Sequence, residues 1–112
     1  MTKFLVLYRS SVSAAEQMAA GTQEQAQAGM EAWMAWAQKA ADAIVDFGSP
    51  VTPTTTVGGS ERGSDPRPVG GYSVLQAESA DALVDLLEDH PHLHAPDASI
   101  EVFEFLPIPG SG

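Results

Sequence analysis

The apolar positions of the first half of the chain predict a strand followed by helices. Residues 4–8 are a short apolar run whose length favours a strand. Residues 13–16 and 22–25 both have the capping-box pattern, a hydroxyl residue followed three positions later by Glu or Gln, and predict a short helix and then a long one. Gly48 and Pro50 are expected to end the long helix. Its expected buried stripe consists of Ala26, Met30, Trp33, Met34, Ala37, Ala41 and Ile44.

The second half of the chain repeats the order of strand, helix and strand. Residues 51–57 contain four threonines and one proline, which predicts an exposed or edge strand. The aperiodic residues 58–70 are expected to be a mobile loop. A strand over 71–77 is followed by a helix capped by Ser79, and the last predicted strand covers 100–106, before a flexible tail at 107–112. Leu83, Leu86 and Leu87 form the expected buried face of that helix.

This order of elements predicts a single α+β domain over residues 1–112. Two βαβ-like halves would make a ferredoxin-like βαββαβ fold, with a four-stranded antiparallel sheet and both helices on one side. The length supports one domain, because each half of a chain of 112 residues is too small for a core of its own.

Both faces of the predicted sheet are apolar. Within residues 4–8, Phe4, Val6 and Tyr8 alternate with Leu5 and Leu7, and both sets are apolar. The last strand shows the same pattern: Ile100, Val102 and Leu106 oppose Phe103 and Phe105. Two helices cover only one face, so we expect a second copy of the chain to cover the other in a homodimer.

The charge and composition exclude several classes of partner. The chain has 15 acidic and 5 basic residues and a net charge of −10, with no cluster of Lys and Arg, which argues against binding nucleic acid or anionic lipid. No apolar run approaches the roughly 18 to 20 residues needed to span a membrane. The N-terminus lacks the pattern of a secretory signal, so a cytoplasmic location is expected. Without cysteine there is neither a disulfide nor a thiolate site.

Asp46 and the two tryptophans are the first candidate site residues. Asp46 follows Ile44 and Val45 at the expected helix end, where burial would raise the pKa of its carboxyl group towards the range useful for acid–base catalysis. Its alternative role is a solvated cap or turn residue. Trp33 lies on the predicted buried stripe and is expected in the core, whereas Trp36 lies beside the stripe and is the better candidate for a pocket wall.

Histidines and one tyrosine supply the remaining candidates. His90, His92 and His94 alternate, and in an extended segment they would project to one side and hold a divalent metal; a surface loop is a poor frame for such a site, so no metal is the leading expectation. If His90 and His92 face a pocket instead, they would contribute imidazoles to ligand binding. Tyr72 opens a predicted strand, where its phenol would bind a ligand or simply pack.

In the order and spacing of these features, the sequence resembles the YCII-related proteins, including the relatives named for a DGPF motif. The resemblance covers most of the chain. It implies a protomer of the dimeric α/β-barrel superfamily, sheet-to-sheet dimerisation, and a pocket between each sheet and its own helices. The residues that carry it are Lys3–Tyr8, Met30, Trp33, Trp36, Asp46–Gly48, Gly70–Val74, Ser79–Leu87, His90-Pro91 and Ile100–Val102.

The chain departs from that family at two places that matter for chemistry. YCII-like members carry a helical histidine proposed to work with an aspartate, and this position falls near Ala32 or Trp33 here. The DGPF loop should lie between Arg62 and Val69, where the sequence offers only Ser-Asp-Pro-Arg-Pro. The leading hypothesis is therefore a small-molecule-binding homodimer, with any acid–base catalysis at an Asp/His pocket. The alternatives are a non-catalytic binding or accessory module and a metal site on the histidine loop. No cofactor can be named.

Overall fold

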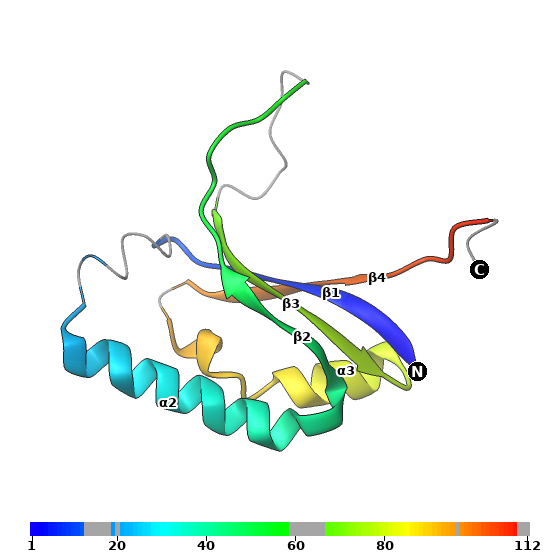
Figure 1. The fold of residues 1–112 in the computed structure, drawn as a ribbon, viewed down its shortest axis with the longest axis horizontal. Coiled ribbons are helices and arrows are strands. Elements are labelled where there is room, and N and C mark those ends of the chain that lie inside the picture. The colour runs from blue at the N-terminus through cyan, green and yellow to red at the C-terminus, as the bar shows by residue number, and fades with distance from the viewer. Residues whose placement is uncertain (13–18, 20, 59–66, 96, 110–112) are drawn as a thin grey trace.

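The computed structural model describes residues 1–12, 19, 21–58, 67–95 and 97–109. Figure 1 shows the arrangement of its strands and helices. The elements, in chain order, are β1 (Thr2–Arg9), α2 (Gln23–Ala40), the 3₁₀ turn η1 (Ala41–Ala43), β2 (Ile44–Pro50), β3 (Val69–Ala77), α3 (Ala80–Leu87), the 3₁₀ turn η2 (Pro91–His94) and β4 (Ser99–Glu104). Among the residues described, no helix has both the length and the apolar character needed to cross a membrane.

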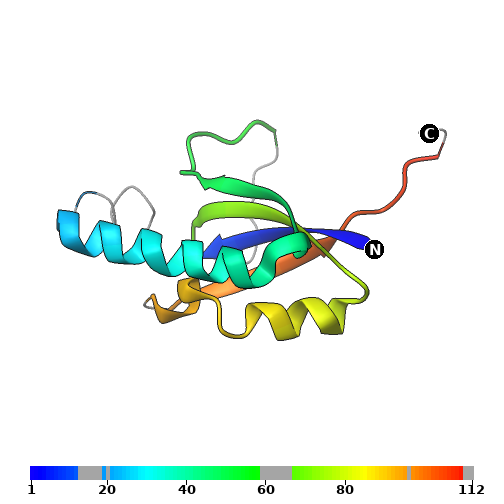
Figure 2. The same cartoon turned by 60° about the horizontal axis from the view of Figure 1, so that its bottom comes forward.

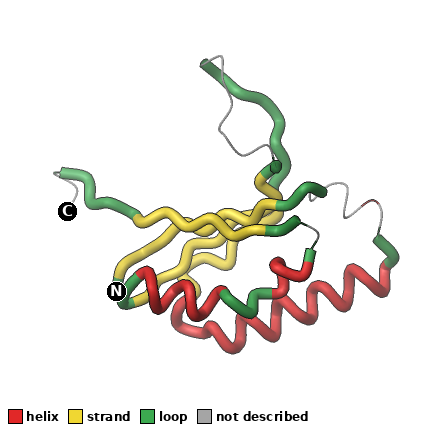
Figure 3. Tube along the Cα trace, turned by 180° about the vertical axis from the view of Figure 1, so that it is seen from behind, coloured by secondary structure: helices red, strands yellow, loops and turns green. Residues whose placement is uncertain are grey.

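The four strands form one antiparallel sheet in the order β2-β3-β1-β4. Both helices cover the same face of this sheet, as the turned view in Figure 2 and the view from behind in Figure 3 show. This arrangement confirms the predicted ferredoxin-like α+β fold.

The core lies between the sheet and the two helices. Alternate residues of β1 and β3 point into it, which confirms the strand periodicity at Phe4, Val6 and Tyr8. Trp36 joins the two helices, because its indole N–H donates a hydrogen bond of 3.2 Å to the carbonyl oxygen of Leu86. The buried apolar residues are Phe4, Val6, Tyr8, Trp36, Ala40, Leu75, Ala77, Leu83 and Leu87.

Two predicted helix starts are confirmed. The Thr22 side chain accepts a hydrogen bond from the backbone N–H of Gln25, and the Gln25 side chain accepts one from the backbone N–H of Thr22. Ser79 accepts a bond from the backbone N–H of Ala82 at the start of α3. The short helix predicted from residue 13 falls outside the described residues except for Ala19, which is helical, and most of the loop predicted at 58–70 is likewise not described.

The predicted end of the long helix was wrong. The helix stops at Ala40 because Ala41 adopts a positive φ of 47°, and after η1 the chain enters β2 at Ile44. Ile44, Val45 and Phe47 are β-branched or aromatic and pack well in a sheet. The strand predicted at 51–57 was also wrong: these residues form an exposed segment, which Figure 1 shows extending away from the sheet.

The buried stripe of α2 is rotated relative to its prediction. Trp36 and Ala40 are buried, whereas Met30 and Met34 are exposed. The reason is that α2 packs on both the sheet and α3, so the helix turns Trp36 towards α3. Residues 21–32 are all exposed, and Figure 2 shows this half of α2 extending past the strands.

Candidate functional site

A cavity of about 440 Å³ lies beneath the N-terminal half of α2. Its walls come from the end of β1, from α2, from β2 and β3 where they pair, and from η2. Trp33 comes from α2, Phe47 from β2 and His92 from η2, so segments far apart in the sequence meet here. The lining residues are Tyr8, Ser10, Val12, Gln25, Ala26, Gly29, Met30, Trp33, Phe47, Gly48, Ser49, Pro50, Gly70, Gly71, Tyr72 and His92.

Aromatic rings form the inner wall of the cavity. The Tyr8 and Trp33 ring centroids are 5.0 Å apart in an edge-on arrangement, and those of Trp33 and Phe47 are 6.1 Å apart. Tyr8 donates a hydrogen bond of 2.9 Å to the Ser73 hydroxyl, which donates one of 2.7 Å to the carbonyl oxygen of Phe47. This chain of bonds fixes the Tyr8 ring, and burial raises the pKa of its phenol.

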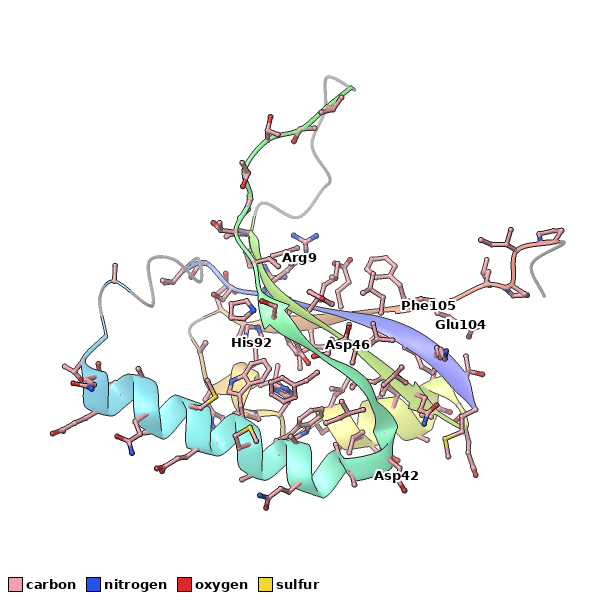
Figure 4. The ribbon with its side chains drawn as sticks, viewed as in Figure 1. Arg9, Asp42, Asp46, His92, Glu104 and Phe105 are labelled. Atoms are coloured by element: carbon pink, nitrogen blue, oxygen red, sulfur yellow. The ribbon has the colours of Figure 1, made fainter. Side chains whose placement is uncertain are left out.

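His92 has a defined tautomer at the cavity wall, and Figure 4 shows its position. Its Nε2 lies 2.9 Å from the carbonyl oxygen of Arg9 and 3.1 Å from that of Ser99. Both neighbours are acceptors, so Nε2 carries the proton and Nδ1 holds a lone pair. Burial lowers the pKa of His92, although the two carbonyl acceptors act in the opposite direction.

His90 lies behind the aromatic wall rather than in the cavity. It is fully buried, and its ring centroid is 4.9 Å from that of Tyr8, 4.4 Å from that of Trp33 and 4.3 Å from that of Trp36. Its Nδ1 accepts the backbone N–H of His92 at 3.0 Å, so Nε2 carries the proton and has no hydrogen-bond partner. Burial lowers the pKa of His90 to about 4, with the neighbouring His92 contributing in the same direction.

This depressed pKa predicts a specific loss of stability in acid. The unfolded chain takes up the proton near the ordinary histidine pKa of about 6.5, whereas folded His90 resists it until about pH 4. The stabilisation is therefore complete above about pH 6.5 and is lost as the pH falls towards 4. Between pH 7 and pH 5 the His90 contribution to the free energy of unfolding should fall by about 2 kcal/mol.

Urea unfolding of His90→Asn at both pH values tests this prediction. Asparagine keeps an acceptor for the backbone N–H of His92 but cannot be protonated. The variant should be less stable at pH 7 and should lose less stability than the natural protein on going to pH 5. His94→Asn, at an exposed position, should show the full loss. An equal loss in all three proteins would refute the prediction.

The structure exchanges the environments expected for the two tryptophans. Trp33, expected in the core, lines the cavity, and Trp36, expected at a pocket wall, is in the core. The apolar pattern of the helix did not predict this exchange, because it contains no information on the position of α3. The Leu86 carbonyl oxygen of α3 accepts the hydrogen bond of the Trp36 indole.

Asp46 is not at a buried helix end. It is an exposed residue of β2, and its carboxylate accepts the backbone N–H of Gly48 at 2.9 Å. It pairs with Val74, which places it on the sheet face away from the helices. Figure 4 shows Asp46 and His92 on different elements. The cavity therefore brings together Trp33 and His92 but not Asp46, and no Asp–His pair forms there among the residues that the structure describes.

Tyr72 lies at the border of the cavity, but its side chain belongs to the other face. It pairs with Leu7 in β1, and residues directly opposite each other in a sheet share a face. Gly71, which pairs with Tyr8, is the residue of this strand on the cavity side. The phenol group of Tyr72 is therefore directed away from a ligand in the cavity.

The histidine loop does not have the extended geometry expected for a metal site. Residues 91–94 form the 3₁₀ turn η2, in which His90 is buried and His94 is exposed. Within the described ranges, no group of three or more His, Cys, Asp or Glu side chains is arranged to hold a metal ion.

No model of a known protein family matches the sequence, and no curated protein matches it. Among solved structures, the chain is similar to 5-chloro-2-hydroxyhydroquinone dehydrochlorinase from Burkholderia phenoliruptrix AC1100, solved in complex with 2,5-dihydroxybenzoquinone. The match has a TM-score of 0.56 and 18% sequence identity, and covers 95% of this chain and 94% of that chain. At this identity the similarity shows a shared fold.

Proposed function

We propose that the protein binds a flat, uncharged aromatic molecule in the cavity between α2 and the sheet. The observation that carries this proposal is the composition of the cavity wall: Tyr8, Trp33 and Phe47 supply rings, and none of the lining residues that the structure describes is Asp, Glu, Lys or Arg. An apolar wall penalises a charged ligand, whereas aromatic side chains favour another ring in stacked or edge-on contact.

The structural neighbour supports a flat ring as the ligand. It is a small-molecule enzyme of the same fold, and its bound molecule is a single hydroxylated ring. On the sequence features described above, we place the chain among the YCII-related proteins of that fold. An acid–base reaction in this cavity would rest on His92 rather than on an Asp–His pair. Binding without catalysis is the alternative, and the exposed position of Asp46 on the other face of the sheet favours it.

The same proposal includes a homodimer formed through the sheet face that the helices leave open. By strand register, Leu5, Val74 and Phe103 lie next to one another on that face. Phe103 and Phe105 are 45% and 49% exposed. Two-fold pairing with a second copy would bury this apolar surface, while the pocket of each protomer would stay on its helix side.

The ligand proposal can be tested by filling the cavity. Gly29 lines it, and a Cβ added there would meet nothing within 4 Å. Gly29→Leu should therefore direct its side chain into the cavity, with its Cβ in open space. We expect the affinity for 2-methoxynaphthalene, measured by equilibrium dialysis, to fall roughly tenfold or more in this variant.

Ala28→Leu is the matched control. Ala28 is the neighbouring helix residue, is exposed, and is not part of the cavity wall. The Ala28→Leu variant adds the same side chain to the same helix. Its affinity for 2-methoxynaphthalene should be unchanged. If the natural protein does not bind this probe, or if the two variants bind it equally, the proposed site is wrong.

A further inference from the structure

We propose that the cavity selects neutral aromatic alcohols of the phenol class, with the ligand hydroxyl donating a hydrogen bond to Nδ1 of His92. This inference rests on the proposed function and specifies which aromatic molecules the site prefers. It depends on the hydrogen-bonding state of each polar group in the cavity wall.

The His92 ring has one nitrogen available to a ligand. Its Nε2–H is shared between the carbonyl oxygens of Arg9 and Ser99, so rotation of the ring would break two hydrogen bonds. In the described structure Nδ1 has no partner, and it is not among the atoms that are buried without one. His92 lines the cavity. In this proposal a ligand there meets Nδ1, an acceptor that is held in place and has no proton of its own.

The hydroxyl groups near the cavity already have partners. Tyr8 donates to Ser73, Ser10 donates to the carbonyl oxygen of Val12, and Ser49 donates to that of Pro50 at 2.9 Å. The Gln25 side-chain oxygen accepts the backbone N–H of Thr22. These hydroxyl protons are used within the protein, and Nδ1 of His92 is an acceptor that makes no hydrogen bond in the described structure, so it calls for a donor from the ligand.

The surroundings of His92 also favour a ligand without charge. Its ring centroid lies 5.3 Å from that of Tyr8 in an edge-on arrangement, and no cation lies among the described lining residues to stabilise a phenolate or a carboxylate. A phenol that keeps its proton satisfies both requirements, since its ring fits the aromatic wall and its O–H meets the lone pair. Aromatic ethers and aromatic hydrocarbons lack the donor.

Two probes of nearly equal shape test the inference, namely 2-naphthol and 2-methoxynaphthalene. In the natural protein we expect 2-naphthol to bind roughly three- to tenfold more tightly, the effect of one neutral hydrogen bond. The absorption spectrum of bound 2-naphthol should be that of the neutral form. Equal affinities, or the spectrum of the naphtholate, would overturn the inference.

Two substitutions at His92 separate its acceptor from its donor. In His92→Gln the side-chain amide can still donate to the carbonyl oxygens of Arg9 and Ser99 but offers no acceptor at the position of Nδ1, so the preference for 2-naphthol should disappear. In His92→Asn the amide oxygen can occupy the position of Nδ1, so the preference should survive in the folded protein, as checked by circular dichroism.

The outcomes distinguish this inference from the proposed function. If both probes bind with equal affinity and Gly29→Leu weakens both, the cavity binds aromatic molecules but does not select their hydroxyl group. If His92→Gln retains the preference, another group recognises the hydroxyl. If neither probe binds the natural protein, the inference and the proposed function both fail.

Discussion

Replacing Gly48 by alanine is expected to lower the free energy of unfolding by at least about 3 kcal/mol. Gly48 has a φ of +85°, a conformation that side chains rarely adopt, and an added Cβ would lie 1.6 Å from the carbonyl oxygen of Tyr72. Either β2 separates from β3 at this point or the backbone of both strands shifts. Urea unfolding at pH 7 measures the loss.

Gly29→Ala is the matched control for this substitution. Gly29 lies inside α2, where a Cβ meets nothing within 4 Å, and alanine is favoured over glycine in a helix by up to about 1 kcal/mol. The two variants should therefore differ in the sign of their effect. A Gly48→Ala protein as stable as the natural one would show that β2 around Gly48, and with it this wall of the cavity, is built differently.

Replacing Leu5 by lysine is expected to convert a dimer into a monomer. Leu5 pairs with Val74 on one side and with Phe103 on the other, so it lies among apolar side chains of the outer face. Burying an unpaired ammonium group from each protomer in a symmetric interface costs several kcal/mol, enough to weaken association about a thousandfold. In sedimentation equilibrium at micromolar concentration, the mass should fall from twice 11.7 kDa to 11.7 kDa.

Val84→Lys controls for a change of hydrophobic residue to lysine. Val84 is 49% exposed on α3, which covers the opposite face of the sheet, and its substitution should leave the dimer intact. If the natural protein sediments as a monomer, the homodimer proposal is wrong. Dissociation of both variants would indicate that the helix side takes part in the interface.

The sequence was most informative where the signal was local. The capping residues Thr22 and Ser79 act on backbone groups a few positions away, so they mark where α2 and α3 begin. The alternation of Phe4 with Leu5 was equally reliable, because in a strand each side chain faces the opposite way from its neighbour. These signals were sufficient for the fold class.

The end of α2 could not be predicted from the same kind of signal. Helices often end at a glycine with positive φ, and Gly48 was the obvious candidate. The residue with positive φ after the helix is instead Ala41, and Ile44 and Phe47 belong to β2. The gain from pairing β2 with β3 depends on residues some thirty positions later, which no local pattern around Ala41 contains.

The positions of the site residues were still harder to predict, because they depend on how separate elements pack together. Whether Trp33 or Trp36 reaches the cavity is decided by contacts with α3. The alternation of histidines from His90 to His94 indicated an extended segment, but Pro91 starts a 3₁₀ turn, which buries His90 and brings His92 to the cavity. Of the two histidines predicted to face a pocket, His92 lies at the cavity wall and His90 lies behind it; their role in ligand binding stays a prediction.

The most direct test of a ligand site between α2 and the sheet is an assigned ¹H–¹⁵N spectrum of the protein titrated with 2-methoxynaphthalene. We expect the indole signal of Trp33 and the backbone signals of Gly70 and Gly71 to shift together with one dissociation constant. The amides of Val74 and Phe103, on the outer face, should shift less. Shifts confined to the outer face, or a spectrum unchanged at saturating probe, would contradict this expectation.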